Sequence, residues 1–131
     1  DRTWHFTPIY SYAPFDVACY QIASEEANLP LYKYLGAYRD EVPIYGSSLT
    51  LDAPNKYAEE ALELKDKGWA AYKLHPPADY DFGIEAHRLC RDAVGPDFTL
   101  MSDPVGSYTP EQCIKFGREL EKLDYKWLEE P

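Results

Sequence analysis

Two acidic side chains stand where short apolar runs end, and carboxylates in that pattern can bind a cation. Asp103 follows the run 99–101, and Glu129 follows the run 125–128. Each run is predicted to be a buried strand, and a helix between them would lay the two strands parallel and side by side. Both carboxylates would then lie at the C-terminal end of the sheet, where parallel α/β folds place their functional sites. The pattern therefore predicts a site for a hard divalent cation such as Mg²⁺.

Two basic side chains stand near the end of an earlier apolar run. Lys73 and His75 lie two residues apart in the run 70–75, so they share one face of the predicted strand. If that face also carries the two acids, a cation site lies opposite a basic pair. This layout suits removal of a proton next to a carboxylate, because metal and ammonium stabilise the enediolate while a neutral Lys or His accepts the proton.

Each of these residues also has an ordinary structural interpretation. Asp103 could cap the turn after its strand, and Glu129 could belong to a solvated strand end. His75 precedes two prolines and could be a loop histidine, while Lys73 could extend to solvent from a strand edge. Their coincidence at consecutive strand ends favours one shared site.

The elements that must position these groups alternate regularly. Helices are predicted over 15–27, 31–36, 54–67, 84–94 and from 110 onward, and strands over 42–47, 70–75, 99–103 and 125–128. Pro14 would open the first helix, and residues 1–13 are expected to be irregular. Thr109, Pro110 and Gln112 form the signature of a capped helix start. The order predicts a parallel sheet with right-handed crossovers, and it fits either an open doubly wound sheet or part of a (β/α)8 barrel.

Composition restricts the class of protein. A chain of 131 residues with 45% hydrophobic and 27% charged residues can form an ordinary globular core. The formal net charge of −10 argues against a nucleic-acid partner, because phosphate binding needs a basic surface. The sequence shows neither a membrane-spanning apolar run nor a secretion signal at its start. Its three cysteines form no C-x-x-C pair, so reduced thiols and a cytoplasmic location are expected.

Seven short segments of the chain, taken in order, resemble the enolase superfamily, in its mandelate racemase/muconate lactonizing enzyme branch. The resemblance runs from Asp16 to Pro131. It is carried by Phe15-Asp-Val-Ala18, Asn28-Leu-Pro-Leu-Tyr-Lys-Tyr-Leu-Gly36, Arg39-Asp-Glu-Val-Pro-Ile-Tyr45, Gly68-Trp-Ala-Ala-Tyr-Lys73, Arg91-Asp-Ala-Val-Gly-Pro-Asp97, Leu100-Met-Ser-Asp103 and Trp127-Leu-Glu-Glu-Pro131. It implies an α/β fold that is a partial TIM-like (β/α) barrel, with the first four parallel strands and their helices, and without most of the family's capping domain. Residues 1–40 would be an N-terminal segment and linking helix toward the capping domain, and residues 41–131 the first half of the barrel.

The resemblance also implies roles for the candidate residues. Asp103 would be the metal ligand that closes the third strand, and Glu129 the ligand that closes the fourth, with Mg²⁺ as the cofactor. Lys73 would stabilise the substrate carboxylate. His75 stands where relatives with a basic pair have a second Lys that acts as the catalytic base. Ser47 matches a position that often contacts substrate. A third metal ligand and a later base would belong to strands beyond this chain.

These roles predict an enolase-superfamily lyase or isomerase that is active only as part of a longer chain. It would abstract, with Mg²⁺, a proton α to a carboxylate. Because His75 replaces the usual Lys, dehydration of a sugar acid or lactone cycloisomerisation is favoured over two-base racemisation. The expected partner is a small carboxylate such as an acid sugar, and the full-length chain is expected to form a homo-oligomer. Two alternatives stay open: a small α/β binding or signalling module similar to a receiver domain, and a non-catalytic relative.

Overall fold

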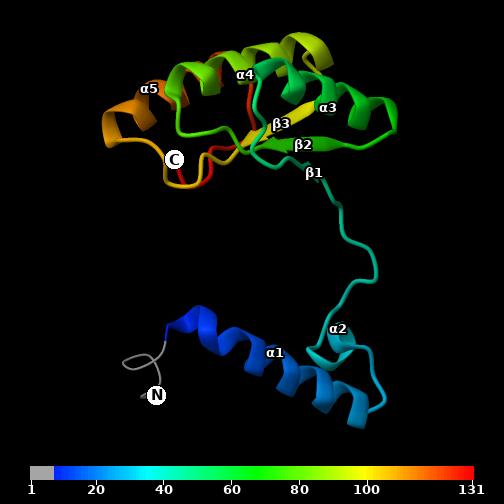
Figure 1. Ribbon diagram of the computed structural model, residues 1–131. Coiled ribbons are helices and arrows are strands. Elements are labelled where there is room, and N and C mark those ends of the chain that lie inside the picture. The colour runs from blue at the N-terminus through cyan, green and yellow to red at the C-terminus, as the bar shows by residue number, and fades with distance from the viewer. Residues whose placement is uncertain (1–7) are drawn as a thin grey trace. The chain divides into compact units, whose positions relative to one another are not determined.

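The chain divides into two compact units, Asp1–Val42 and Pro43–Pro131, in a computed structural model that describes residues 8–131 (Figure 1). The expectations for residues 1–7 lie outside the described residues. The second unit contains the three described strands and all of the predicted site residues. It therefore contains the whole candidate site.

The first unit consists of helix α1 (Ile9–Glu26) and the short helix α2 (Leu31–Tyr34). Helix α1 begins earlier than predicted, so Pro14 lies inside the helix and does not open it. Pro14 removes one backbone donor from the helix. The first turn is closed before it, where Ser11 N–H donates to the Pro8 carbonyl at 2.9 Å. The described part of the segment expected to be irregular is thus mostly helical.

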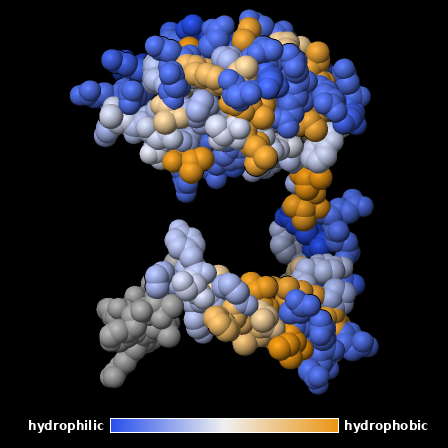
Figure 2. Space-filling model, in the orientation of Figure 1, coloured by the Kyte–Doolittle hydropathy of each residue, from blue (hydrophilic) through white to orange (hydrophobic). Residues whose placement is uncertain are grey.

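Apolar side chains gather on the surface of the first unit (Figure 2). Phe15, Val17 and Ile22 on helix α1 are all more than half exposed, at 70%, 58% and 60%. Within residues 8–131, no helix combines the length and the apolar character that crossing a bilayer requires.

The second unit is built on a parallel sheet. Its strands, in spatial order, are β1 (Gly46–Ser47), β2 (Ala71–Leu74) and β3 (Thr99–Ser102). The register places Ser47 beside Lys73 and Lys73 beside Met101. The fourth predicted strand is reduced to one parallel bridge, between Ser102 and Leu128. The predicted order of parallel strands is therefore present. The strand predicted over 42–47 covers only Gly46–Ser47, and the one predicted over 125–128 is a single bridge.

Three helices cover one face of this sheet (Figure 1). They are α3 (Pro54–Asp66), α4 (Tyr80–Val94) and α5 (Pro110–Lys122). Helix α5 starts with the predicted capping box, in which Gln112 N–H donates to Thr109 Oγ1 at 3.3 Å and Thr109 N–H donates to Gln112 Oε1 at 3.0 Å. Helix α4 starts before the predicted Ile84, because the Asp79 carboxylate caps it by accepting Phe82 N–H at 2.9 Å.

The hydrophobic core lies between the sheet and the helices. Tyr72, Leu74 and Leu100 are fully buried in it, together with Tyr57, Ala61, Ala86, Cys90, Val94 and Phe98. Side chains alternate along a strand, so Lys73 and Met101 point to the opposite face. The candidate site therefore stands on the face of the sheet that α3, α4 and α5 do not cover.

Arg91 connects the loops at the N-terminal edge of the sheet. Its guanidinium donates to the carbonyls of Leu123 at 2.7 Å, Gly95 at 2.7 Å, Phe98 at 2.8 Å and Asp124 at 2.8 Å. These carbonyls follow the ends of α4 and α5 and precede β3. Hydrogen bonds from a charged donor are stronger than neutral ones, so one side chain holds two connections together, the one between α4 and β3 and the one after α5.

Replacing Arg91 with alanine should lower the free energy of unfolding by about 3 kcal/mol, because several part-buried carbonyls lose a charged donor. Amide hydrogen exchange in α4 and α5 of the whole protein measures this loss locally. Arg118 is an exposed arginine on α5, and its replacement by alanine is the matched control, with an expected change below about 0.5 kcal/mol. Equal loss of protection in both variants would contradict the role of Arg91.

Candidate metal and acid–base site

The four predicted side chains meet at the C-terminal end of the sheet. Lys73 Nζ lies 3.0 Å from Asp103 Oδ2 and 2.9 Å from Glu129 Oε2. His75 Nε2 lies 3.1 Å from the same Asp103 oxygen. Three adjacent segments thus bring two carboxylates, an ammonium and an imidazole together, as the alternation along the strands leads one to expect.

Backbone hydrogen bonds hold both acids in place. Asp103 N–H donates to the Leu74 carbonyl at 2.8 Å, and Asp103 Oδ1 accepts the N–H of Val105 at 3.2 Å. Glu129 N–H donates to the Ser102 carbonyl at 2.8 Å. One carboxylate is therefore tied to β2 and the other to β3, and this sets their separation.

Two aromatic rings flank the charged groups. The Tyr45 ring lies 5.8 Å from Lys73 Nζ and 5.8 Å from the Trp127 ring, measured to ring centroids. Trp127 Nε1–H donates to Glu129 Oε2 at 3.3 Å. A ring face attracts an ammonium, so these residues add contacts to Lys73 and to Glu129.

Side chains that the sequence analysis missed hold the backbone of His75. Its N–H donates to Ser48 Oγ at 2.8 Å, and its carbonyl accepts the hydroxyl of Tyr57 at 2.8 Å. Ser48 is buried, whereas the predicted Ser47 is exposed and lies beside Lys73 in the register. The contact of Ser47 with substrate stays a prediction, and Ser48 is the serine that contacts the site.

The contacts decide the charges of Lys73 and Asp103. Burial opposes the charged form of Lys73, but the hydrogen bonds to Glu129 and Asp103 outweigh it and hold the pKa of Lys73 above its ordinary value. Burial likewise opposes the charged form of Asp103, but Lys73, the Val105 N–H and His75 together lower the pKa of Asp103. At neutral pH the pair is therefore an ammonium and a carboxylate, and Lys73 is suited to hold negative charge and not to accept a proton.

The donor set fits a hard divalent cation. Asp103 Oδ2 and Glu129 Oε2 converge on one cationic atom, Lys73 Nζ, so a single small cation can reach both oxygens. Carboxylate oxygens are ligands that Mg²⁺ prefers, and Mg²⁺ often keeps several waters beside one or two carboxylates. Within residues 8–131 no group of three or more His, Cys, Asp and Glu side chains forms a larger metal site. Further ligands would be water, substrate or residues beyond this chain.

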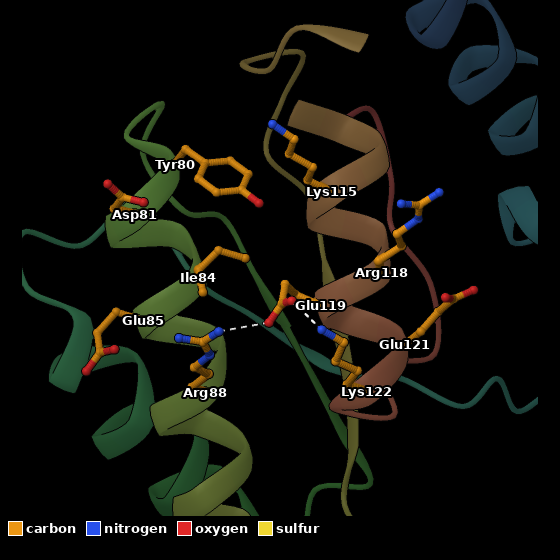
Figure 3. A pocket seen from close by; sticks show the side chains of 10 residues that line it. All are labelled: Tyr80, Asp81, Ile84, Glu85, Arg88, Lys115, Arg118, Glu119, Glu121 and Lys122. Carbon is orange, nitrogen blue, oxygen red and sulfur yellow. Dashed lines mark hydrogen bonds and ion pairs between the residues drawn. The ribbon is translucent and has the colours of Figure 1, made fainter. Parts of the chain in front are cut away.

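A groove of about 1050 Å³ lies away from these residues, between the outer surfaces of α4 and α5 (Figure 3). Glu119 stands in it and accepts hydrogen bonds from Arg88 Nη2 at 2.8 Å and Lys122 Nζ at 2.6 Å. Arg88 and Lys122 are largely exposed. Exposed ion pairs of this kind are typical of a solvated helix surface, so the groove adds no chemistry to the site.

His87 is a buried titratable group that the sequence analysis also missed. Its Nδ1 lies 2.6 Å from the Gly83 carbonyl and its Nε2 lies 2.8 Å from Ser102 Oγ. Burial lowers the pKa of His87 from 6.5 to about 4, although the hydrogen bond to Gly83 acts in the other direction. Its position was the available signal, because Gly83, His87 and Cys90 follow helical spacing on one face.

Acid should therefore destabilise the fold through His87. The unfolded chain binds the proton near pH 6.5 and the folded chain only near pH 4, so this contribution is complete above pH 6.5 and is lost as the pH falls toward 4. The free energy of unfolding should decrease by about 3 kcal/mol across this window, as measured by urea unfolding of the whole protein at stepwise pH. The variant His87→Phe should lack this part of the pH dependence, and an unchanged profile in that variant would contradict the assignment.

Similarity to known proteins identifies the family. Residues 56–131 match the family described as Enolase C-terminal domain-like. The chain is 31% identical over 131 residues to the hydrophobic dipeptide epimerase of Enterococcus faecalis, covering 100% of this chain and 36% of the relative. It is 31% identical over 128 residues to the L-talarate/galactarate dehydratase of Salmonella typhimurium, covering 94% of this chain and 32% of the relative. A crystal structure of D-glucarate dehydratase from Agrobacterium tumefaciens complexed with magnesium has a TM-score of 0.72 at 36% identity, covering 78% of this chain and 30% of that one.

The matches define both the fold and its extent. The chain spans about a third of the length of the curated relatives it matches. The parallel sheet and its helices are thus part of a TIM-like barrel, as predicted, and this excludes the alternative of a receiver-like module. The chain belongs to the Enolase C-terminal domain-like family, in the mandelate racemase/muconate lactonizing enzyme branch of the enolase superfamily.

Proposed function

We propose that the whole protein of which these residues are part removes the proton α to the carboxylate of a small acid, with Mg²⁺ as its cofactor. The observation that supports this most directly is the position of Lys73 Nζ, 3.0 Å from Asp103 Oδ2 and 2.9 Å from Glu129 Oε2, with His75 Nε2 beside the same Asp103 oxygen. Cation ligands, a fixed positive charge and an acid–base group thus share one site.

Each residue has one part in the proposed reaction. Asp103 and Glu129 hold Mg²⁺, which when bound supplies positive charge to the substrate carboxylate. Lys73 holds the negative charge that develops on that carboxylate as the α-proton leaves. His75 presents Nε2 to the site. The ionised Asp103 oxygen can only accept, so Nε2 carries the proton in their contact at 3.1 Å, and His75 takes the α-proton there in the tautomer whose proton is on Nδ1. Within the described residues, its Nδ1 is buried without a hydrogen-bond partner, so Nε2 is the nitrogen that faces the chemistry.

The reaction class follows from the relatives and from the basic pair. The reported relatives are an epimerase and two dehydratases, and both reactions break a C–H bond. A dehydration or a lactone cycloisomerisation needs one proton acceptor at this position, whereas two-base epimerisation would use a second lysine where His75 stands. We therefore assign a sugar-acid dehydratase, or a lactone cycloisomerase, ahead of a racemase.

Deuterium exchange tests the proposal in the whole protein. The protein is incubated in D₂O with Mg²⁺ and with galactarate, glucarate, talarate or a hydrophobic dipeptide, and the α-proton is followed by NMR. The expected result is either loss of the α-proton signal or appearance of the dehydrated product, and EDTA should stop both. His75→Gln should slow that reaction by about 100-fold or more. Bound Mg²⁺ without exchange on any of these acids would favour the non-catalytic relative.

A further inference from the structure

Ser102 is the residue from which both candidate metal ligands are positioned. It precedes Asp103 directly, at the end of β3. Its carbonyl accepts Glu129 N–H at 2.8 Å, and its own N–H donates to the Trp127 carbonyl at 3.2 Å. It is also the bridge partner of Leu128. A displacement of Ser102 would therefore move both carboxylates.

His87 holds the side chain of Ser102 from the helix side of the sheet. The Gly83 carbonyl can only accept a hydrogen bond, so His87 Nδ1 carries the proton in that contact at 2.6 Å. In the neutral ring Nε2 then has the free lone pair, and it accepts the hydroxyl of Ser102 at 2.8 Å. Both ring nitrogens are satisfied, and His87 and Ser102 are each 0% exposed.

The same histidine also contacts the segment that leads to Glu129. Tyr125 donates its hydroxyl to the His87 carbonyl at 3.0 Å. The His87 ring lies 5.0 Å from the Tyr125 ring and 5.1 Å from the Phe116 ring, between centroids. His87 thus connects α4 with β3, with α5 and with the last segment of the chain.

We propose that His87 is a positioning residue for the metal site: it fixes Ser102, and through Ser102 it sets the distance between the carboxylates of Asp103 and Glu129. The inference rests on the proposed function in one respect, namely that these two acids bind a divalent cation. If His87 only filled the core, its replacement would change stability and leave the affinity for the cation intact.

Mn²⁺ binding to the folded whole protein, followed by EPR, separates these two roles. His87→Phe keeps an aromatic ring of similar size and removes both ring nitrogens. The dissociation constant for Mn²⁺ should rise about tenfold, the size of effect seen for outer-shell partners of metal ligands. Ser102→Ala removes the other half of the contact and should give a similar rise. Because both changes break one hydrogen bond, the double variant should bind Mn²⁺ as well as either single variant.

Two further variants separate the hydrogen bond from general packing. Phe116→Leu disturbs the ring packed on His87 without touching its nitrogens, so it should lower stability and leave the Mn²⁺ affinity unchanged. His87→Gln retains a donor and an acceptor and should recover part of the affinity lost in His87→Phe. Circular dichroism establishes that each variant is folded, and Ser102→Ala provides the test if His87→Phe is not.

The outcomes distinguish this inference from the proposed function. Wild-type affinity in both His87→Phe and Ser102→Ala, with binding lost in Asp103→Asn, would overturn the role of His87 alone. Additive effects in the double variant would also overturn it, because His87 would then not act through Ser102. Failure of the wild type to bind Mn²⁺, or full binding by Asp103→Asn, would overturn the metal site itself.

Discussion

Replacing Asp103 with asparagine should reduce Mg²⁺-dependent turnover of the whole protein by about a thousandfold or more, because a bound divalent cation supplies several kcal/mol of charge stabilisation. Asparagine has nearly the same shape but lacks the negative charge that faces Lys73 and His75 at 3.0 and 3.1 Å. The measurement is kcat over a titration of Mg²⁺, which also detects a weakened affinity for the metal.

Asp97 provides the matched control for this substitution. It is an exposed acid before β3, at the edge of the sheet opposite Asp103. Asp97→Asn removes the same charge from the same strand region and should leave kcat and the Mg²⁺ dependence unchanged. Wild-type turnover in Asp103→Asn, or equal losses in the two variants, would be incompatible with a metal ligand at Asp103.

Lys73→Met is expected to lower kcat by about 100- to 1000-fold, the cost of removing one group that stabilises developing negative charge. Its effect on Mg²⁺ should differ from that of Asp103→Asn. Removal of an ammonium that lies within 3.0 Å of both carboxylates takes away a competing positive charge, so Mg²⁺ affinity should not fall. Asp103→Asn should therefore lower both kcat and Mg²⁺ affinity, whereas Lys73→Met should lower kcat alone.

Lys126 supplies the control for the charge at Lys73. It is exposed, on the segment that leads to Glu129, and Lys126→Met should leave turnover unchanged. Lys73→Arg keeps the charge but replaces a compact ammonium with a planar fork, and should recover only part of the activity. Full activity in Lys73→Met would show that substrate charge is stabilised elsewhere.

Local signals in the sequence were sufficient for most of the second unit. Pro54 and the capping box at Thr109 predicted the starts of α3 and α5, and short apolar runs predicted β2 and β3 within about one residue of their observed limits. Helix α4 starts earlier than predicted because the Asp79 side chain caps it. Helix α1 is longer than predicted, because Pro14 has the pattern of a helix start but the helix continues through it.

The geometry of the candidate site was predictable for a similar reason. Residues two apart on a strand share a face, so the strand ends alone placed Lys73 and His75 with Asp103. The groups that hold these residues were not predictable, because their contacts join distant parts of the chain. Ser48 binds the backbone of His75 from the residue after β1, and His87 binds Ser102 from α4. Such pairings depend on how the helices dock on the sheet, which no local pattern in the sequence records.

A crystal structure of the whole protein at saturating Mg²⁺ would show whether Asp103 and Glu129 share one divalent cation beside Lys73. We expect a single octahedral ion about 2.0–2.1 Å from one oxygen of each carboxylate, with Lys73 Nζ and His75 Nε2 facing the same space. An ion bound elsewhere, with Lys73 still bridging two carboxylates that touch no metal, would contradict this expectation.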